Sequence, residues 1–480
     1  MLRLRSYIGP VSVLAAALLC VALEAADPHR PAFHFQPPAN WMNDTMGIFW
    51  KGEYHIFYLY NPDGPVWRQA KEWGHASSKD LIHWKHLPAA LGPVPGGPEN
   101  LCCQTGSVTI ANGVPTAVYT CAPGICMATS DDQMITWRRS ANNPVIPDAP
   151  PGLDVYGFRD PFLYHGETSW YLLQGSGIKG QGGRIFVYKS DDLNKWEFLH
   201  PLLPEEGKTD QVWEVPGLFR IGNQDLLMYS PTKESLYTRY FLGSFQNEQF
   251  IPTSRGKMDF GGYFYAATTF ADDQRRRLMI AWTREGRSKE AVLKAGWSGA
   301  LSAPRQLSLN PQGQLLIEPV AELNRLHGKH KTYSNLRLTA GEAKLLDFRG
   351  DTLDIVAEFD PGDAKRIGLK VRSSANGEEE TLVYIDRASG EFVFDSTRSS
   401  KSSATDKKKL SDAFSVKDGK TVKLRVLVDR SIIEAFVDSR VAVSGRAYPE
   451  LPESLGVRVF AEGGSAIVRK LDIWEMKPVW

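Results

Sequence analysis

The chain has 480 residues with 56 basic and 55 acidic side chains, so its formal net charge is only +1. Proteins that bind nucleic acid or an anionic membrane surface carry basic stripes, so we expect neither partner and favour a neutral substrate. The length exceeds one ordinary domain of roughly 100–200 residues, which predicts at least two domains.

The N-terminal segment has the pattern of a secretory signal peptide. Arg3 and Arg5 precede an apolar run over residues 11–23, and the small residues 25–26 provide a cleavage region. This run is shorter than the roughly 20 residues that a transmembrane helix needs. We therefore expect residues 1–25 to be removed on export, the mature protein to be extracellular or periplasmic, and no membrane anchor to remain.

A five-bladed β-propeller is predicted over residues 26–328. Short β-rich runs are separated here by Gly, Pro, Asn and Asp turns, and no long amphipathic helix interrupts them. An element that begins with Ser and ends with Trp recurs at residues 78–84, 130–137 and 190–196. The spacing of about 50 to 60 residues is the size of one four-stranded blade, and the available length suits five blades.

Four cysteines cluster in this part of the chain, between residues 102 and 126. In an oxidising compartment an even, clustered set predicts one or two local disulfides, whose pairing the sequence leaves open. Their spacing matches no common zinc template, so we expect no metal and no cofactor. The four residues are Cys102, Cys103, Cys121 and Cys126.

A β-sandwich is predicted over residues 329–480, which makes the whole chain all-β. Residues 352–359 and 421–429 alternate largely between apolar and polar side chains, as antiparallel strands with one buried face do. We find no catalytic constellation here and expect this domain to stabilise the propeller.

Three acidic residues of the first domain stand beside aromatic or apolar neighbours. Asp44 follows Trp, Met and Asn, Asp160 lies within FRDP, and Glu214 lies within VWEVP. A propeller brings the inner ends of successive blades together at a central funnel, so residues far apart in sequence converge there. We expect these three carboxyl groups to meet.

Glycosidic cleavage needs one ionised and one protonated carboxyl group. Trp213 and the apolar residues after Glu214 are expected to raise the pKa of that acid, which favours it as the proton donor. Asp44 is then the ionised partner. Asp160, kept ionised by Arg159, is expected to hold sugar hydroxyls.

At these residues the sequence strongly resembles glycoside hydrolase family 32, the family of invertases, inulinases, levanases and fructan exohydrolases. Residues 41–47 (WMNDTMG) resemble the family's WMNDPNG nucleophile motif, residues 158–161 its RDP motif and residues 213–216 (WEVP) its WEC-P motif. Supporting matches cover nearly the whole mature chain. They lie at residues 73–78, 259–266, 296–305 and, for the C-terminal sandwich, 428–436.

The resemblance implies retaining hydrolysis of terminal β-D-fructofuranosyl linkages in sucrose or fructans. Asp44 would attack the anomeric carbon, Glu214 would protonate the leaving oxygen and then activate water, and Asp160 would hold the fructosyl hydroxyls. The tryptophans at positions 41, 73 and 297 are expected to offer flat surfaces to sugar rings. The substrate-binding residues carried over from the family are Asn43, Trp73, Gln104, Thr105, Arg159 and Trp297.

The chain departs from the family's pattern at four positions. Thr45 and Met46 replace Pro-Asn after the nucleophile, Leu59 replaces Gln, and Val215 replaces Cys. Loss of the amide at Leu59 removes a hydrogen bond near the nucleophile, worth about 1–3 kcal/mol when a buried partner is left unpaired. These changes bear on substrate preference more than on reaction type.

Three alternatives stay open at this stage. A fructosyltransferase would pass the same fructosyl group to another sugar instead of water. An inverting pentosidase would place its carboxyl groups roughly 6.5–9.5 Å apart rather than about 5–5.5 Å. A non-catalytic fructan-binding relative would have lost turnover through the changes around Asp44. The preferred fructan, exo or endo attack, and the oligomeric state are left open too.

Overall fold

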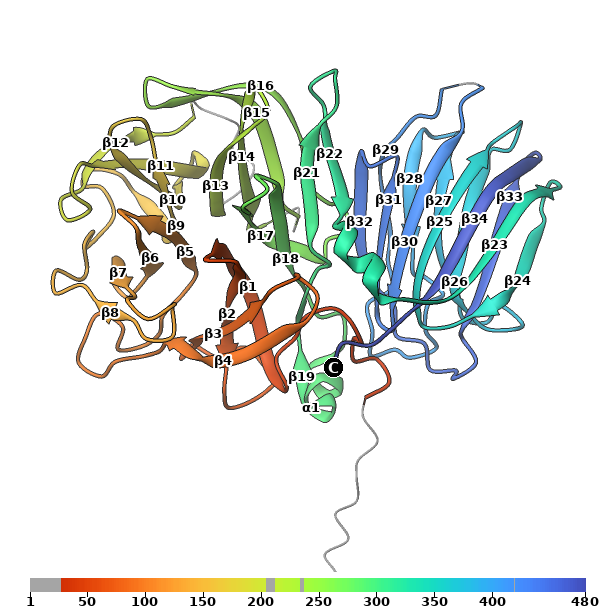
Figure 1. The fold of residues 1–480 in the computed structure, drawn as a ribbon, viewed down its shortest axis with the longest axis horizontal. Helices are drawn as coiled ribbons and strands as arrows, with labels where there is room; N and C mark the ends of the chain where they lie inside the picture. The colour runs from red at the N-terminus through yellow and green to blue at the C-terminus, as the bar shows by residue number, and fades with distance from the viewer. Residues whose placement is uncertain (1–26, 204–211, 234–236, 418) are drawn as a thin grey trace, which may run out of the picture.

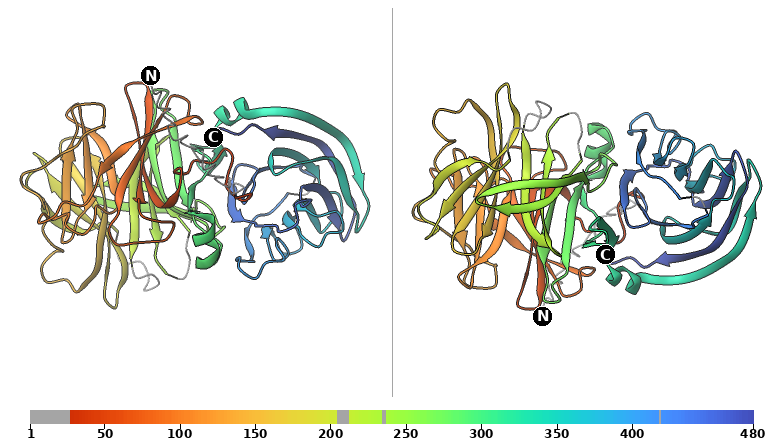
Figure 2. Two further views of the ribbon diagram at one scale, coloured as in Figure 1. Left: turned by 90° about the horizontal axis from the view of Figure 1, so that it is seen from below. Right: turned by 90° about the horizontal axis from the view of Figure 1, so that it is seen from above.

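The structure is a computed structural model that describes residues 27–203, 212–233, 237–417 and 419–480. The expected signal peptide lies outside these ranges. Within them, no helix has the length and apolarity needed to cross a membrane. Two bodies of β-sheet lie side by side, a propeller and a β-sandwich, and the views from above and below show the same separation (Figures 1 and 2).

Five blades of antiparallel strands form the propeller, as predicted. Strands β1, β5, β9, β13 and β17 surround its middle in Figure 1. Blade I contains β1 (Asn40–Trp50), β2 (Glu53–Asn61), β3 (Glu72–Ser78) and β4 (Trp84–Leu91). Blade II contains β5 (Gly106–Ala111), β6 (Val114–Thr120), β7 (Ile125–Thr129) and β8 (Arg138–Arg139). Blade III contains β9 (Val155–His165), β10 (Trp170–Ile178), β11 (Gly182–Ser190) and β12 (Glu197–Pro201).

The last two blades complete the ring. Blade IV contains β13 (Trp213–Ile221), β14 (Gln224–Pro231), β15 (Arg239–Gln246) and β16 (Gln249–Lys257). Blade V contains β17 (Phe264–Ala271), β18 (Arg277–Thr283), β21 (Arg305–Leu309) and β22 (Leu315–Pro319). Helix α1 (Lys289–Ala295) and the short strands β19 (Trp297–Ser298) and β20 (Ala300–Leu301) lie between β18 and β21, and β19 pairs in parallel with β1.

The recurring Ser…Trp element is one local structure used three times. In blade I the Trp84 indole N–H donates to the carbonyl of Leu81, a residue with a φ of 65°. The same indole-to-carbonyl bond forms in blades II and III, from Trp137 and Trp196. Each copy connects the third and fourth strands of its blade, which explains why the repeat had the spacing of a blade.

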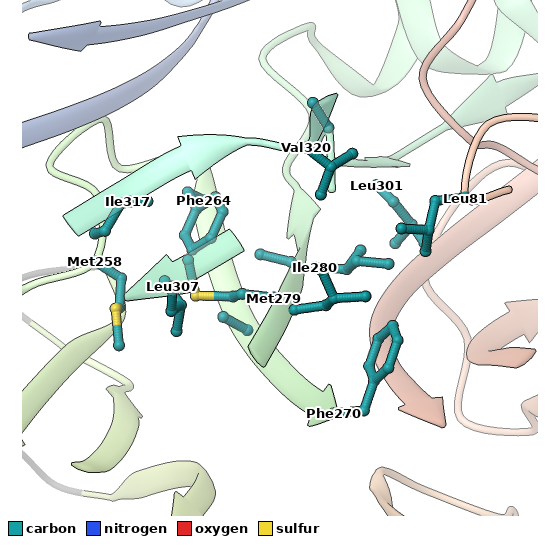
Figure 3. Close-up of a cluster of buried hydrophobic side chains, with 14 of the residues drawn as sticks. Leu81, Met258, Phe264, Phe270, Met279, Ile280, Leu301, Leu307, Ile317 and Val320 are labelled. Atoms are coloured by element: carbon teal, nitrogen blue, oxygen red, sulfur yellow. The ribbon is translucent and has the colours of Figure 1, made fainter. Parts of the chain in front are cut away.

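The core of blade V packs against blade I. Phe264, Met279, Ile280 and Leu307 from blade V lie in one buried cluster with Leu81 of blade I (Figure 3). This cluster fixes the last blade against the first and closes the ring.

A two-layer sandwich follows the short 3-10 helix η1 (Ala321–Leu326), as predicted. Its first sheet has the order β23-β34-β25-β30-β31-β32 and its second β24-β33-β26-β27-β28-β29. The first-sheet strands are β23 (His327–Leu338), β34 (Ala466–Met476), β25 (Thr352–Asp360), β30 (Val422–Asp429), β31 (Ile432–Val437) and β32 (Val441–Arg446). Those of the second are β24 (Ala343–Arg349), β33 (Gly456–Glu462), β26 (Arg366–Ser373), β27 (Thr381–Asp386), β28 (Glu391–Asp395) and β29 (Lys409–Ala413).

One of the expected disulfides forms. Cys121 and Cys126 are bonded across the turn between β6 and β7, whereas Cys102 and Cys103 are buried free thiols.

Candidate active site

The first strand of four blades, β1, β9, β13 and β17, is interrupted by a β-bulge. Each bulge holds a non-glycine residue in the left-handed region: φ is 25° at Asp44, 64° at Asp160, 47° at Val215 and 51° at Ala266. Such a residue costs on the order of 1–3 kcal/mol, and this strain gathers at functional sites. The bulges interrupt the alternation of β1, β9, β13 and β17, and the residues that carry the chemistry lie at these interruptions.

The Asp44 carboxyl is bound by the neighbouring blade. Thr105, just before β5, donates its hydroxyl to Asp44 Oδ2 at 2.5 Å. Burial raises the pKa of Asp44 to about 6, and the negative charge of Glu214 raises it further. The hydrogen bond from Thr105 and the positive charge of Lys71 both lower this pKa. Asp44 is therefore ionised above about pH 6, as a nucleophile requires.

Glu214 is held on both carboxyl oxygens. Arg159 Nε donates to Oε1 at 2.6 Å, and the Tyr265 hydroxyl donates to Oε2 at 2.5 Å. The sequence predicted apolar surroundings for this acid, whereas its two carboxyl oxygens contact a guanidinium from blade III and a phenol from blade V.

Asp160 lies almost completely buried between two blades. Its backbone N–H donates to the Thr120 hydroxyl of blade II at 2.8 Å, and its Oδ2 accepts from the Val215 N–H of blade IV at 3.3 Å. Burial raises the pKa of Asp160 well above its usual range, and the charge of Glu214 raises it further while Arg159 opposes. Arg159 acts on Asp160 only through its charge, because its guanidinium is bonded to the Glu214 carboxylate.

Two predicted binding residues lie beside this cluster. Asn43 precedes the nucleophile, and its Oδ1 is buried without a hydrogen-bond partner among the described residues, so it is an acceptor left for a ligand. Gln104 is partly exposed. Its backbone N–H donates to the carbonyl of Thr120, and its carbonyl accepts from the Trp73 indole.

All three tryptophans expected to offer open ring surfaces are buried, and Trp41 is 6% exposed. Trp73 is 0% exposed, and its indole donates to the Gln104 carbonyl at 2.9 Å, which supports the segment that presents Thr105. Trp297 is 1% exposed, donates to Asp27 and lies under the Arg287 guanidinium. The parallel pairing of β19 with β1 places Trp297 in the packing between the N-terminal segment and blade V, so its ring is not displayed to a sugar.

Sequence reasoning missed Tyr265 and Lys71. Tyr265 lies in the matched stretch 259–266, one residue before a left-handed position, just as Glu214 does; that shared pattern was its signal. Lys71 is only 4% exposed, and its ammonium lies 4.8 Å from the centroid of the Trp67 ring. This buried lysine immediately precedes β3, and no sequence motif identified it.

Three carboxyl groups and two cations therefore converge from blades I, III and IV. Asp44, Asp160 and Glu214 are near enough to influence one another's pKa, and Arg159 and Lys71 balance part of their charge. In the described ranges no group of three or more His, Cys, Asp or Glu side chains is arranged to hold a metal ion. A nucleophile and a proton donor with different partners make this arrangement suited to covalent glycoside cleavage.

Comparisons with known proteins agree with this chemistry. The profile "Glycosyl hydrolases family 32 N-terminal domain" matches residues 34–319, and "Glycosyl hydrolases family 32 C terminal" matches residues 322–475. The chain is 33% identical to a sucrose-6-phosphate hydrolase of Zymomonas mobilis, over 93% of this chain and 92% of that protein. It is also 33% identical to a levanase of Bacillus subtilis, over 98% of this chain and 75% of that protein.

Solved structures show the same architecture. The fructan 1-exohydrolase IIa of Cichorium intybus superposes with a TM-score of 0.86 at 26% identity, covering 95% of this chain and 98% of that one. An exo-inulinase of Aspergillus awamori gives a TM-score of 0.82 at 26% identity, covering 95% and 99%.

Proposed function

The chain belongs to glycosyl hydrolase family 32, and from this membership and the site geometry we propose that Asp44 is the nucleophile and Glu214 the general acid and base. The reaction is the retaining hydrolysis of terminal β-D-fructofuranosyl linkages in sucrose or fructans, through a fructosyl-enzyme intermediate. The observation that supports these roles best is the separate anchoring of the two carboxyl groups, Asp44 by Thr105 and Glu214 by Arg159 and Tyr265.

The first step forms the fructosyl-enzyme. A carboxylate oxygen of Asp44 bonds to the anomeric carbon while the glycosidic C–O bond breaks, and the leaving oxygen takes the proton of Glu214. In the second step Glu214 takes a proton from water, whose oxygen bonds to the anomeric carbon and displaces Asp44. Two inversions give net retention.

Asp160 and Asn43 hold the fructosyl unit in this proposal. The carboxyl of Asp160 lies near that of Asp44, and its oxygens suit hydrogen bonding to vicinal sugar hydroxyls. The unpartnered Oδ1 of Asn43 accepts from another hydroxyl next to the reacting carbon.

Fructose release from sucrose, inulin and levan tests the assignment, with glucose counted beside it for sucrose. We expect Asp44→Asn and Glu214→Gln each to lower kcat/KM by at least about a thousandfold. Asp131→Asn, an exposed carboxylate of blade II, is the matched control and should retain full activity.

Retention of activity by either active-site variant would overturn the assigned role. An excess of glucose over fructose from sucrose would indicate transfer to a sugar acceptor instead of water.

We also propose that the protein is exported and that residues 1–25 are its signal peptide. The basic and apolar pattern of this segment supports export, and so does the Cys121–Cys126 disulfide, because disulfides persist in oxidising compartments. The mass of the protein recovered outside the cytoplasm should correspond to a chain that starts at Ala26. A chain that keeps Met1 and stays in the cytoplasm would contradict the proposal.

A further inference from the structure

The Tyr265 hydroxyl faces three acceptors with a single proton to give. Its oxygen lies 2.5 Å from Glu214 Oε2, 3.1 Å from the Pro231 carbonyl and 3.3 Å from the Ser230 carbonyl. A phenol donates one hydrogen bond at a time, so these acceptors compete. Burial and the charge of Glu214 raise the pKa of Tyr265 far above its usual range, so the hydroxyl keeps its proton throughout.

The opposite oxygen of Glu214 has a partner whose role is fixed. Arg159 Nε donates to Oε1 at 2.6 Å, and a guanidinium can neither accept a hydrogen bond nor lose its proton in a protein. The contact at Oε1 is therefore the same in both states of Glu214. Only the contact at Oε2 can change when Glu214 gains or loses a proton.

We propose that Tyr265 is a positioning residue whose hydroxyl changes acceptor with the protonation state of Glu214. When Glu214 is protonated, the Tyr265 hydroxyl donates to the Pro231 carbonyl, and the carboxyl proton is left for the glycosidic oxygen. As that proton departs and the glycosidic bond breaks, the hydroxyl turns to Oε2. When Glu214 takes a proton from water in the second step, the hydroxyl returns to Pro231.

This movement requires only rotation of the O–H bond, because the three acceptors surround one oxygen. Pro231 and Glu214 lie on paired strands, β14 and β13, so the acceptors are held at a fixed spacing. A hydrogen bond that forms only as charge develops stabilises the transition state more than the bound substrate. The inference rests on the proposed role of Glu214.

The test compares Tyr265→Phe with Tyr263→Phe on two substrates. Tyr263 is a buried tyrosine two residues earlier, and its hydroxyl lies 3.5 Å from Asp406 of the sandwich, so it controls for loss of a buried phenol. Sucrose needs a proton on its leaving group, whereas 4-nitrophenyl β-D-fructofuranoside releases a stable phenolate without one. Values of kcat/KM report only the steps up to departure of the leaving group.

We expect Tyr265→Phe to lower kcat/KM for sucrose by about 10- to 100-fold and that for the nitrophenyl fructoside by less than about threefold. Tyr263→Phe should change neither. The alkaline limb of the sucrose profile should move up by roughly one pH unit in Tyr265→Phe, because ionised Glu214 loses a donor. Asp44, Arg159 and Asp160 also face Glu214, and they are unchanged in both variants.

Equal losses on both substrates, or an alkaline limb that stays in place, would overturn the inference and leave Tyr265 a packing residue. The nitrophenyl substrate also separates this failure from failure of the proposed function. If Asp44→Asn still cleaves it, the assigned nucleophile is wrong; if Asp44→Asn is inactive and the losses in Tyr265→Phe are equal, only the present inference fails.

Discussion

The Asp44 carboxyl is buried beside two other acids, and it stays usable as a nucleophile because positive and hydrogen-bonding groups oppose its burial. Thr105 donates directly to it, and the Lys71 ammonium acts through its charge. Lys71 is itself buried, which lowers its pKa, while Asp44 and Asp160 raise it. Each group therefore favours the charged form of the other.

Replacement of Lys71 by Met should shift the acid limb of the activity profile. The pKa of Asp44 is raised to about 6, so activity falls as the pH drops through that value. Without the nearby cation the ionised form is less favoured, and the limb should move upward by roughly one pH unit. The measurement is kcat/KM for sucrose between pH 4 and 8.

Lys79→Met is the control for this change, because Lys79 is an exposed lysine of the same blade. An acid limb at the same pH in Lys71→Met and the wild type would show that Lys71 does not influence Asp44.

At the level of elements, the end of β6 connects three parts of the site. The Thr120 hydroxyl accepts from the Asp160 N–H at 2.8 Å, and the Thr120 N–H donates to the carbonyl of Thr105. Gln104 donates its own N–H back to Thr120. Thr120 of blade II therefore contacts both Thr105, which donates to Asp44, and the bulge that carries Asp160.

Thr120→Val keeps the shape of this side chain and removes the acceptor of Asp160. A buried N–H left without a partner costs about 1–3 kcal/mol, and the Asp160 backbone is expected to shift in order to reduce this cost. We expect kcat to fall by about tenfold. Thr116→Val on the same strand removes a hydroxyl that bonds only locally, to Val114, and should leave kcat unchanged.

Both threonine variants should lose similar amounts of thermal stability, measured by unfolding midpoints. If Thr120→Val keeps the kcat of Thr116→Val, the link between β6 and Asp160 has no catalytic effect.

At the scale of the whole molecule, a fully buried charge cluster joins the N-terminal segment, the propeller and the sandwich. Asp429 of β30 accepts the backbone N–H groups of residues 32–34 and the Nδ1 of His34 at 2.8 Å. Arg305 of blade V binds Glu434 of β31 at 3.2 Å. Burial alone would lower the pKa of His34, but the hydrogen bonds and charges of Asp429 and Glu434 raise it to about 9.

This cluster makes the stability of the protein depend on pH above neutrality. A histidine whose pKa is higher in the folded state than in the unfolded state stabilises the folded protein. This stabilisation is complete below the unfolded pKa near 6.5 and is lost as the pH rises through the folded pKa of about 9. The unfolding midpoint should therefore fall between pH 6.5 and 9. In His34→Gln that fall should be largely absent, while His83→Gln, at an exposed pair with Asp80, should behave as the wild type. An equal fall in His34→Gln would assign it to other groups.

The sequence alone determined the class of fold and singled out the three acids to which we assign the chemistry. The Ser…Trp element showed the period of the blades. Its hydrogen bonds join residues only a few positions apart, so a short stretch of sequence is enough to specify it. The alternation after residue 330 showed the sandwich for a similar local reason, since successive side chains of a strand face opposite sides. Asp44, Asp160 and Glu214 stood out because each lies beside aromatic or apolar neighbours in a motif that resembles one of the family's.

Only the tertiary structure decided which groups these acids contact. Arg159 adjoins Asp160 in sequence yet binds Glu214, and Tyr265 and Lys71 reach the site from blades V and I. Trp297 is buried because β19 pairs with β1 across the closure of the ring. Such contacts depend on how blades pack around a common centre, and at Glu214 that packing joins residues 51 and 55 positions apart, beyond what any local pattern records.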